Sequence, residues 1–217
     1  MRRIAILTSN AGAGSNLQAL IDAQTDGYDG QLVCVISSSP NAYALVRAHE
    51  ADIPTEVMDF GEYQAAGKPR SLYEQDVALK LQTYNPDLIV CAGWTLVLSK
   101  VFLRYFPWRV LNIHPGLLGD GPGQPYTLPN GQHADPCTGL SGENAVKAML
   151  SGKQPYAGST VHVVTDDVDA GPVVLRGVVP IKPDDDVKSL YHRLKGEEHR
   201  IIIKSLHQLC MPMRTVK

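Results

Sequence analysis

Apolar and polar positions follow two different patterns in the first hundred residues. Short, unbroken apolar runs are typical of strands that are buried on both faces of a parallel sheet. Such runs lie within residues 3–8, 31–37 and 88–92, and a further short strand is predicted over 55–58. Between them, apolar residues recur at helical spacing over residues 17–21, 41–51 and 70–84. This alternation predicts an α/β fold, with a Rossmann-like, mostly parallel sheet and helices on both of its faces.

The second half of the chain departs from the regular alternation. Further strands are predicted over 110–114, 157–164 and 173–181, the last of them near a sheet edge. Further helices are predicted over 99–106, 143–150 and 186–209, with Gly196 as a candidate break in the last helix. Residues 60–69 have no clear period, which predicts an exposed loop. We expect these elements to extend one sheet, so that residues 1–217 form a single domain.

Composition and charge are those of an ordinary soluble globular protein. Hydrophobic residues make up 44% of the chain, charged residues 19%, and the formal net charge is −2. Neither a nucleic-acid partner nor a membrane is indicated, because basic runs and long apolar segments are lacking. The first residues, MRRIAILTSN, contain an apolar part that is too short for a signal sequence. The four cysteines form no CxxC pair and are interpreted as reduced core thiols of a cytoplasmic protein.

Asn112 and His114 stand at the end of the predicted strand over 110–114. They are two positions apart, so their side chains point to the same face of the sheet. Pro115 ends the strand and Gly116 permits a sharp turn. Ligands of open α/β sheets bind at the carboxyl ends of the strands, where an amide can stabilise an oxyanion and an imidazole can transfer a proton. The alternative is a strand-end pair that only satisfies backbone groups.

Asp169, in the loop after the strand over 157–164, could complete this pair. A carboxylate that faces His114 would stabilise the imidazolium. Asn, His and Asp together can then promote acyl transfer between two bound substrates without a protein nucleophile. The alternative for Asp169 is a solvated turn acid. His162 alternates with apolar residues and is interpreted as a buried structural histidine. A metal site formed by His114, His162 and Asp169 is a disfavoured alternative, because these residues lack a compact ligand spacing, and no metal is expected.

Two loops in the first half have the composition of ligand-binding segments. Residues 9–16 are small and precede a helix, so backbone N–H groups could hold an anion; alternatively, Ser15 and Asn16 serve only as helix caps. Residues 93–98 leave a buried strand with much apolar surface, which suits either the core or a slot for a flat ring system. Arg70 stands at the start of the helix over 70–84, either solvated or in contact with an anion or a carbonyl group.

Several motifs together resemble those of the folate-dependent formyltransferases. They are Gly-Ser-Asn-Leu-Gln-Ala at 14–19, Asn-Pro-Asp at 85–87, Ala-Gly-Trp at 92–94, Leu-Asn-Ile-His-Pro at 111–115, Gly-Ser-Thr-Val-His-Val-Val-Thr at 158–165, Asp-Ala-Gly-Pro at 169–172 and Glu-His at 198–199. The resemblance runs from the first predicted strand to the last predicted helix. The first motif points to the branch of the family whose acceptor is glycinamide ribonucleotide.

The resemblance implies that a formyl group passes from 10-formyltetrahydrofolate to the amine of glycinamide ribonucleotide in purine biosynthesis. The folate is a co-substrate, and no metal is implied. The implied partners are these small molecules, without nucleic acid or membrane, and the chain is expected to be a monomer or a homodimer. Residues 1–110 would form the nucleotide- and phosphate-binding half, and residues 111–217 the catalytic and folate-binding half.

The resemblance also implies a role for individual residues. In catalysis, Asn112 would bind the formyl oxygen, His114 would be the acid and Asp169 would tune it. The acceptor would be held by its phosphate at Gly14, Ser15 and Asn16, and by its amine-bearing end at Glu198. The folate would be bound by Arg70, Thr95, Leu96, Val97, Leu98 and Asn112.

Three positions depart from the family pattern. The family usually has Ser and Pro where this chain has Gly116 and Gly119, and often has Arg where this chain has Leu96. Residues 117–139 are also longer and richer in Gly and Pro than expected, with little to bury. This composition predicts a mobile flap that excludes water from the site; the alternative is a surface loop or an oligomer contact.

These departures lie at the mouth of the site. The motifs therefore predict the formyl-transfer chemistry more firmly than they predict the identity of the acceptor. The alternatives are a sugar-nucleotide formyltransferase, a formyltetrahydrofolate hydrolase, or a non-catalytic folate- or nucleotide-binding protein. The phosphate-loop motif disfavours the first two. Asn112, His114 and Asp169 together argue against the third.

Overall fold

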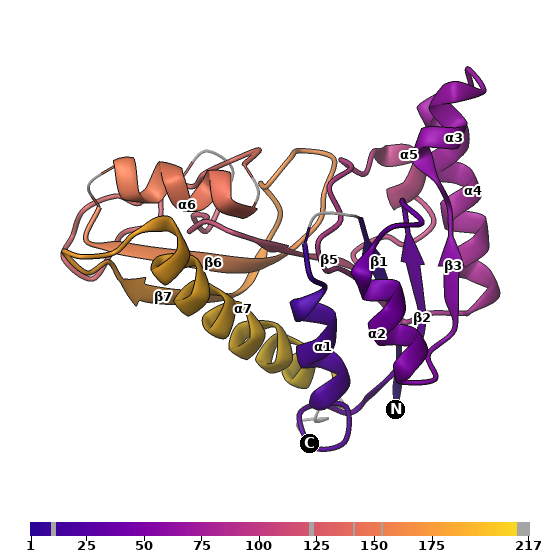
Figure 1. Cartoon of the computed structure of the whole chain (residues 1–217), viewed down its shortest axis with the longest axis horizontal. Coiled ribbons are helices and arrows are strands. Elements are labelled where there is room, and N and C mark those ends of the chain that lie inside the picture. Colours follow the sequence, from indigo (N-terminus) through magenta and orange to yellow (C-terminus); the bar gives the residue numbers. More distant parts are fainter. Residues whose placement is uncertain (10–11, 122–123, 141, 153, 212–217) are drawn as a thin grey trace, which may run out of the picture.

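The computed structural model describes residues 1–9, 12–121, 124–140, 142–152 and 154–211. Its described part contains a seven-stranded sheet with the order β3-β2-β1-β4-β5-β6-β7 (Figure 1). The strands are β1 (Arg2–Thr8), β2 (Gly30–Ser37), β3 (Thr55–Val57), β4 (Leu88–Cys91), β5 (Val110–His114), β6 (Tyr156–Val163) and β7 (Val173–Pro180). Strands β1 to β5 pair in parallel, whereas β6 and β7 are antiparallel to their neighbours. The predicted α/β sheet is therefore confirmed, and the strand predicted near an edge is the edge strand β7.

Helices cover both faces of the sheet, as the sequence pattern predicts. They are α1 (Ser15–Asp22), α2 (Tyr43–Glu50), α3 (Phe60–Ala65), α4 (Arg70–Thr83), α5 (Lys100–Leu103), α6 (Gly142–Ser151) and α7 (Val187–Cys210). Apolar residues of α1, α2 and α7 form one buried cluster with the sheet, and those of α4 and α5 form a second cluster. Figure 1 shows α6 and α7 beside β6 and β7, with α3, α4 and β3 at the opposite side.

The paired clusters explain the unbroken apolar runs of the inner strands. In β1, Ile4 and Ile6 belong to the first cluster, whereas Ala5 and Leu7 belong to the second. Successive side chains of a strand point to opposite faces, so a strand covered on both faces needs apolar residues at every position. Because β1, β4 and β5 are parallel, their carboxyl ends lie side by side at the same end of the strands, where the ligand site is expected.

Two of the sequence-based expectations about helices are wrong. Residues 60–69 are not simply a loop, because α3 begins after Asp59, whose side chain accepts a hydrogen bond from the Gly61 N–H at 2.8 Å. The rings of Phe60 and Tyr63 pack against Tyr73, which stabilises this short helix. Helix α7 is not broken at Gly196. A glycine inside a helix costs about 1 kcal/mol, and the buried apolar face of α7 offsets that cost.

The expectation that residues 117–139 have little to bury is also wrong. Leu117, Leu128 and Ala134 form a small buried cluster, and Cys137 is buried against α6 and α7. The segment is further joined by the isolated bridges Leu118–Pro125 and Thr127–His133. Its first residues are fixed by Thr160, whose hydroxyl donates to the Gly116 carbonyl and accepts from the Leu118 N–H. The described residues of this segment, 117–121 and 124–139, are thus packed onto the domain.

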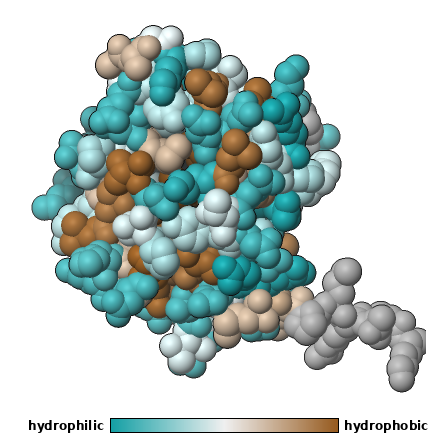
Figure 2. Space-filling model, turned by 90° about the vertical axis from the view of Figure 1, so that its right-hand side faces the viewer, coloured by the Kyte–Doolittle hydropathy of each residue, from teal (hydrophilic) through white to brown (hydrophobic). Residues whose placement is uncertain are grey.

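The cysteines and the surface of the protein were also considered in the sequence-based predictions. All four cysteines are free and buried, as predicted. Within the described residues, none of the helices has the length and apolarity needed to cross a membrane. On the face that carries α3, α4 and β3, hydrophobic side chains are interspersed with hydrophilic ones (Figure 2).

Candidate active site

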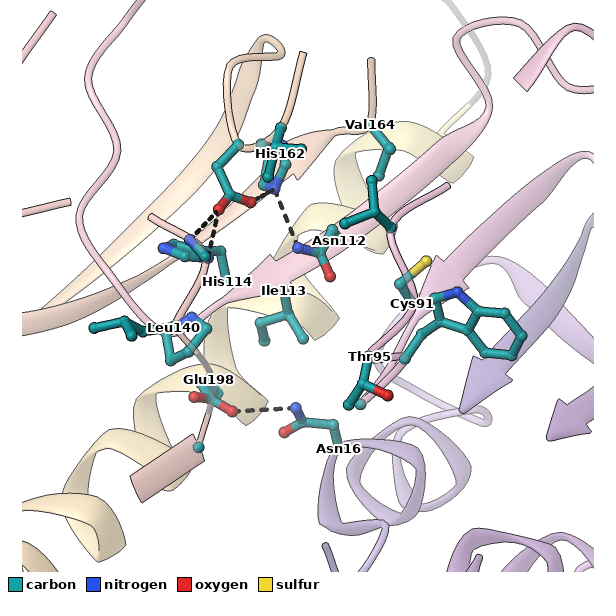
Figure 3. A pocket seen from close by; sticks show the side chains of 18 of the residues that line it. Asn16, Cys91, Thr95, Asn112, Ile113, His114, Leu140, His162, Val164 and Glu198 are labelled. Carbon is teal, nitrogen blue, oxygen red and sulfur yellow. Dashed lines mark hydrogen bonds and ion pairs between the residues drawn. The ribbon is translucent and has the colours of Figure 1, made fainter. Parts of the chain in front are cut away.

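A pocket of about 590 Å³ opens at the carboxyl ends of β4 and β5. Asn112, His114 and Asp169 all line it, so the predicted convergence of these three residues is confirmed. Two groups of polar side chains face each other across the pocket (Figure 3). Asn112, His114 and His162 lie on one side, Asn16 and Glu198 lie on the other, and Ile113 lies between them.

Asn112 is oriented by a cross-strand partner. In the antiparallel β5–β6 pair, Asn112 lies directly opposite His162, and such pairs bring side chains into contact. The Asn112 Nδ2 atom lies 3.3 Å from His162 Nε2. The His162 Nδ1–H donates to the Val163 carbonyl at 3.1 Å, so Nε2 of the neutral ring accepts from the Asn112 amide. Because an amide nitrogen carries two hydrogens, Asn112 keeps a second N–H for a substrate oxygen.

Asp169 lies between the two histidines. Its Oδ2 atom is 3.5 Å from His114 Nδ1 and its Oδ1 atom is 3.6 Å from His162 Nε2. The side chains of both histidines are 3% exposed and that of Asp169 is 9% exposed, so the carboxylate lies beside the two rings in a poorly hydrated environment, where electrostatic interactions are strong. Asp169 adopts φ 54°, a left-handed conformation that Asp and Asn tolerate better than most residues. The loop therefore holds the carboxylate in a specific position.

Burial keeps His162 neutral. It lowers the pKa of His162 below the usual 6.5, and the Asp169 charge opposes this effect without reversing it. The pKa of His199, on α7, is lowered in the same direction, mainly by burial. Below pH about 6.5 the unfolded chain therefore binds more protons than the folded one.

We expect the free energy of unfolding to fall as the pH drops through and below about 6.5. NMR titration of the histidine ring signals should place the pKa of His162 below 6.5. In denaturant unfolding, a His162→Asn variant should lose less stability between about pH 7.5 and about pH 5.5 than the parent chain does. An equal loss in both chains would show that His162 does not contribute to this pH dependence.

A second cavity, of about 400 Å³, adjoins the first at the start of α1. Gly14, Ser15 and Asn16 line it, and Asn16 also lines the main pocket. The proposed capping role of Ser15 and Asn16 is wrong, since Gly14 is the N-cap, with φ 65°, and no side chain caps the helix. A side chain at Gly14 would lie 2.9 Å from the Cα atom of Ala44, so the close approach of α2 requires glycine here. The first N–H groups of α1 are left for an anion.

Glu198 is a buried carboxylate of the main pocket and contacts Asn16, which lines both cavities. It is 3% exposed and accepts hydrogen bonds from Asn16 Nδ2 at 3.1 Å and from the Ser159 hydroxyl at 3.3 Å. Lys195, one helical turn earlier, lies 2.6 Å from its Oε2 atom. Burial is the largest single effect on Lys195 and lowers its pKa. The charge of Glu198, the hydrogen bond to it and the contact with Tyr191 together raise the pKa more, so the net direction is upward and Lys195 stays charged. The Oδ1 atom of Asn16 is buried without a protein partner among the described residues.

The loop over 95–98 lines the main pocket, as predicted. Its backbone is held at both ends: the Thr95 N–H donates to the Ser9 hydroxyl at 3.2 Å, and Ser99 donates to Glu74. Arg70 pairs with Glu74 at 3.0 Å and donates to the Val97 carbonyl. Arg70 does not itself line the pocket, so the structure places it behind the loop as a support.

Sequence reasoning missed two groups of residues. His162 was predicted to be only structural, whereas it is buried and also contacts Asn112 and Asp169 in the pocket. Tyr191 and Lys195 line both cavities. The spacing of Lys195 three residues before Glu198 on a helix is the signal that could have revealed it, because residues i and i+3 share a face.

The arrangement suits acyl transfer between two substrates. One wall offers an amide N–H donor and an imidazole paired with a carboxylate, and the other wall offers a buried carboxylate beside helix N–H groups and a lysine. Among the described residues, no group of three or more His, Cys, Asp or Glu side chains is arranged to hold a metal ion.

The sequence of this chain is similar to those of known formyl-transferring enzymes, which agrees with the chemistry inferred from the site. The formyl transferase family model matches residues 2–206. The chain is 35% identical over 224 residues to phosphoribosylglycinamide formyltransferase of Saccharomyces cerevisiae, covering 96% of this chain and 97% of the yeast protein. It is also 36% identical over 211 residues to the trifunctional purine biosynthetic protein adenosine-3 of Drosophila melanogaster, covering 96% of this chain but 14% of the fly protein.

A solved structure supports the same conclusion. Glycinamide ribonucleotide transformylase 1 from Symbiobacterium toebii superposes with a TM-score of 0.81 at 35% identity, covering 97% of this chain and 88% of that one. The fold and the site thus define an enzyme that transfers formyl groups. The chain belongs to the formyl transferase family.

Proposed function

We propose that this enzyme transfers the formyl group of 10-formyltetrahydrofolate to the amine of glycinamide ribonucleotide, a step of purine biosynthesis. The observation that carries the proposal is the meeting of two cavities at Asn16, with the formyl-transfer residues in one and the helix N-terminus in the other. The names of the relatives support the choice of acceptor. The four buried free thiols support a cytoplasmic location. Whether the chain is a monomer or a homodimer stays a prediction.

The residues at the start of α1 fit the phosphate of the acceptor. The uncapped N–H groups and the positive end of the helix dipole favour an anion. Lys195 lines the same cavity and adds a positive charge. Glu198, which is buried and anchored by Asn16 and Ser159, would receive the amine, and the unpaired Asn16 Oδ1 atom would accept one of its hydrogens.

The opposite wall fits the formyl group and its carrier. The loop over 95–98 would hold the pterin ring in the main pocket, with Arg70 fixing the loop from behind. The amine nitrogen would form a bond to the formyl carbon, which gives a tetrahedral intermediate, and the bond from that carbon to the folate nitrogen would then break. Asn112 would donate to the oxyanion of the tetrahedral intermediate. His114 would move the proton from the attacking amine to the departing nitrogen, and Asp169 would stabilise its charged form.

A formyl-transfer assay tests the proposal. Purified chain is incubated with 10-formyltetrahydrofolate, with and without glycinamide ribonucleotide, while the release of tetrahydrofolate and the formylation of the amine are followed. We expect both products only when the acceptor is present. Release of tetrahydrofolate at the same rate without the acceptor would instead identify a formyltetrahydrofolate hydrolase. If a sugar nucleotide is formylated in a parallel assay and glycinamide ribonucleotide is not, the chain is a sugar-nucleotide formyltransferase.

Removal of the Asn16 side chain should weaken the acceptor site selectively. Asn16→Ala deletes the Oδ1 atom proposed to accept from the amine of the acceptor, and it also deletes the hydrogen bond that anchors Glu198. A hydrogen bond that involves a charged group contributes about 1.5–3 kcal/mol. We therefore expect KM for glycinamide ribonucleotide to rise about 10- to 100-fold, with little change in KM for the folate. Asn41→Ala, at an exposed position outside both cavities, is the control. Equal increases in both KM values would show that Asn16 only stabilises the fold and does not bind the acceptor.

A further inference from the structure

Besides its contact with Asp169, His114 has a hydrogen-bond partner outside the group formed by Asn112, His162 and Asp169. Its Nε2 atom lies 2.7 Å from the backbone carbonyl oxygen of Pro136, in the long segment after β5. A carbonyl oxygen can only accept, so Nε2 carries the proton of this contact. The other ring nitrogen, Nδ1, faces Asp169 at 3.5 Å. The two nitrogens of His114 therefore have different surroundings, one fixed by backbone and the other beside the carboxylate.

Gly116 makes this contact possible. A Cβ atom at this position would lie 2.2 Å from the Pro136 oxygen and 2.7 Å from His114 Nε2. Real Cβ atoms do not approach other atoms this closely, so any larger residue would have to push the carbonyl or the imidazole away. The backbone of Gly116 is not in the left-handed conformation that favours glycine. Glycine is therefore required here because the atoms around Nε2 leave no space for a side chain.

The part of the chain that carries the carbonyl is anchored on both sides. Ala134 is buried and its N–H donates to the Tyr126 carbonyl at 2.9 Å. Cys137 is buried, and its N–H donates to Asp135 at 2.9 Å. Two residues further on, the Gly139 N–H donates to Asp169 Oδ2 at 3.2 Å. Residues 134–139 therefore contact both members of the His114–Asp169 pair.

We propose that residues 134–139 are a positioning element for formyl transfer, in which the Pro136 carbonyl fixes the Nε2 proton of His114 and Gly116 provides the space. The partner of one imidazole nitrogen decides which tautomer the ring adopts. With the Nε2 proton held by backbone, Nδ1 is the nitrogen that exchanges a proton with the substrates and shares it with Asp169. The Gly139 N–H holds the carboxylate toward that same nitrogen. This inference rests on the proposed function for its kinetic consequence, but not for the tautomer.

The tautomer of His114 can be measured without any substrate. The ¹⁵N shifts of the ring are recorded in uniformly labelled protein at alkaline pH, where histidine side chains are ordinarily neutral. They are assigned by comparison with a His114→Asn variant. We expect the proton on Nε2 and a bare Nδ1. A proton on Nδ1 would overturn the proposal, even if formyl transfer is confirmed. Conversely, a failed transfer assay would leave this measurement valid, so the two proposals fail separately.

Gly116→Ala tests the role of the contact in the reaction. The added methyl group should displace the Pro136 carbonyl, so the Nε2–H signature should be lost and kcat should fall about 10- to 100-fold, the scale expected for a small misplacement of a reacting group. KM for both substrates should change by less than about threefold. Gly121→Ala is the matched control in the same segment, because its Cβ would meet only ordinary contacts at 3.5 Å or more. It should leave kcat and the ring signals unchanged.

Two outcomes for Gly116→Ala would contradict the proposal. One is a kcat within about twofold of the parent value. The other is a lower kcat with unchanged His114 nitrogen shifts, which would indicate a structural effect elsewhere. If the variant does not fold, as judged by circular dichroism and thermal unfolding, the tautomer in the parent protein decides the question.

Discussion

Replacement of His114 by asparagine is expected to lower kcat about 10³- to 10⁴-fold, near the upper end of what a positioned acid–base group contributes. Asparagine keeps an amide near the place of Nδ1 but cannot carry the proton from the amine to the departing nitrogen. His114 is 3% exposed and contacts both Asp169 and the Pro136 carbonyl, so no water can readily replace it. The measurement is steady-state formyl transfer with both substrates saturating.

The control for this variant is His49→Asn, at an exposed position of α2 that lines neither cavity. It should keep the activity of the parent chain. Thermal unfolding of both variants separates a catalytic loss from a loss of folded protein. A folded His114→Asn variant that retains more than about a tenth of the parent kcat would show that His114 is not the proton-transfer group.

Asp169→Asn is expected to lower kcat about 100-fold, at the lower end of the acid–base range. The variant removes the negative charge beside His114 and His162 while keeping the size of the side chain. Asparagine also tolerates the left-handed backbone at this position, where φ is 54°, so the loop should keep its conformation. Because the charge stabilises imidazolium, the loss should appear in kcat more than in KM for either substrate.

Asp166→Asn is the matched control for Asp169→Asn. Asp166 belongs to the same loop, is exposed, and does not line the main pocket. It should keep the parent kcat within about twofold. Equal losses in the two variants would mean that the overall charge of the loop matters, and would argue against a specific pairing between Asp169 and His114.

Some features of this protein follow from its sequence alone. The unbroken apolar runs predict buried parallel strands, because a strand covered on both faces needs apolar residues at every position. The two-residue spacing of Asn112 and His114 places them on one face of β5, and Pro115 ends that strand. These are local properties of the backbone, so the fold class and the pair at its centre were predictable. The motifs around them were sufficient to indicate the family.

Other features depend on contacts between distant parts of the chain. His162 is 50 residues from Asn112 and meets it only because the register of β5 and β6 places the two opposite each other. Glu198, with Lys195 beside it, reaches Asn16 only when α7 packs beside α1.

The contact between His114 and Pro136 spans 22 residues of a segment with no regular period. Register, helix packing and the path of such a segment are decided by the burial of many side chains at once, which no local pattern encodes. The sequence therefore determined the fold class and the central pair of residues, and only the tertiary structure decided which groups orient them.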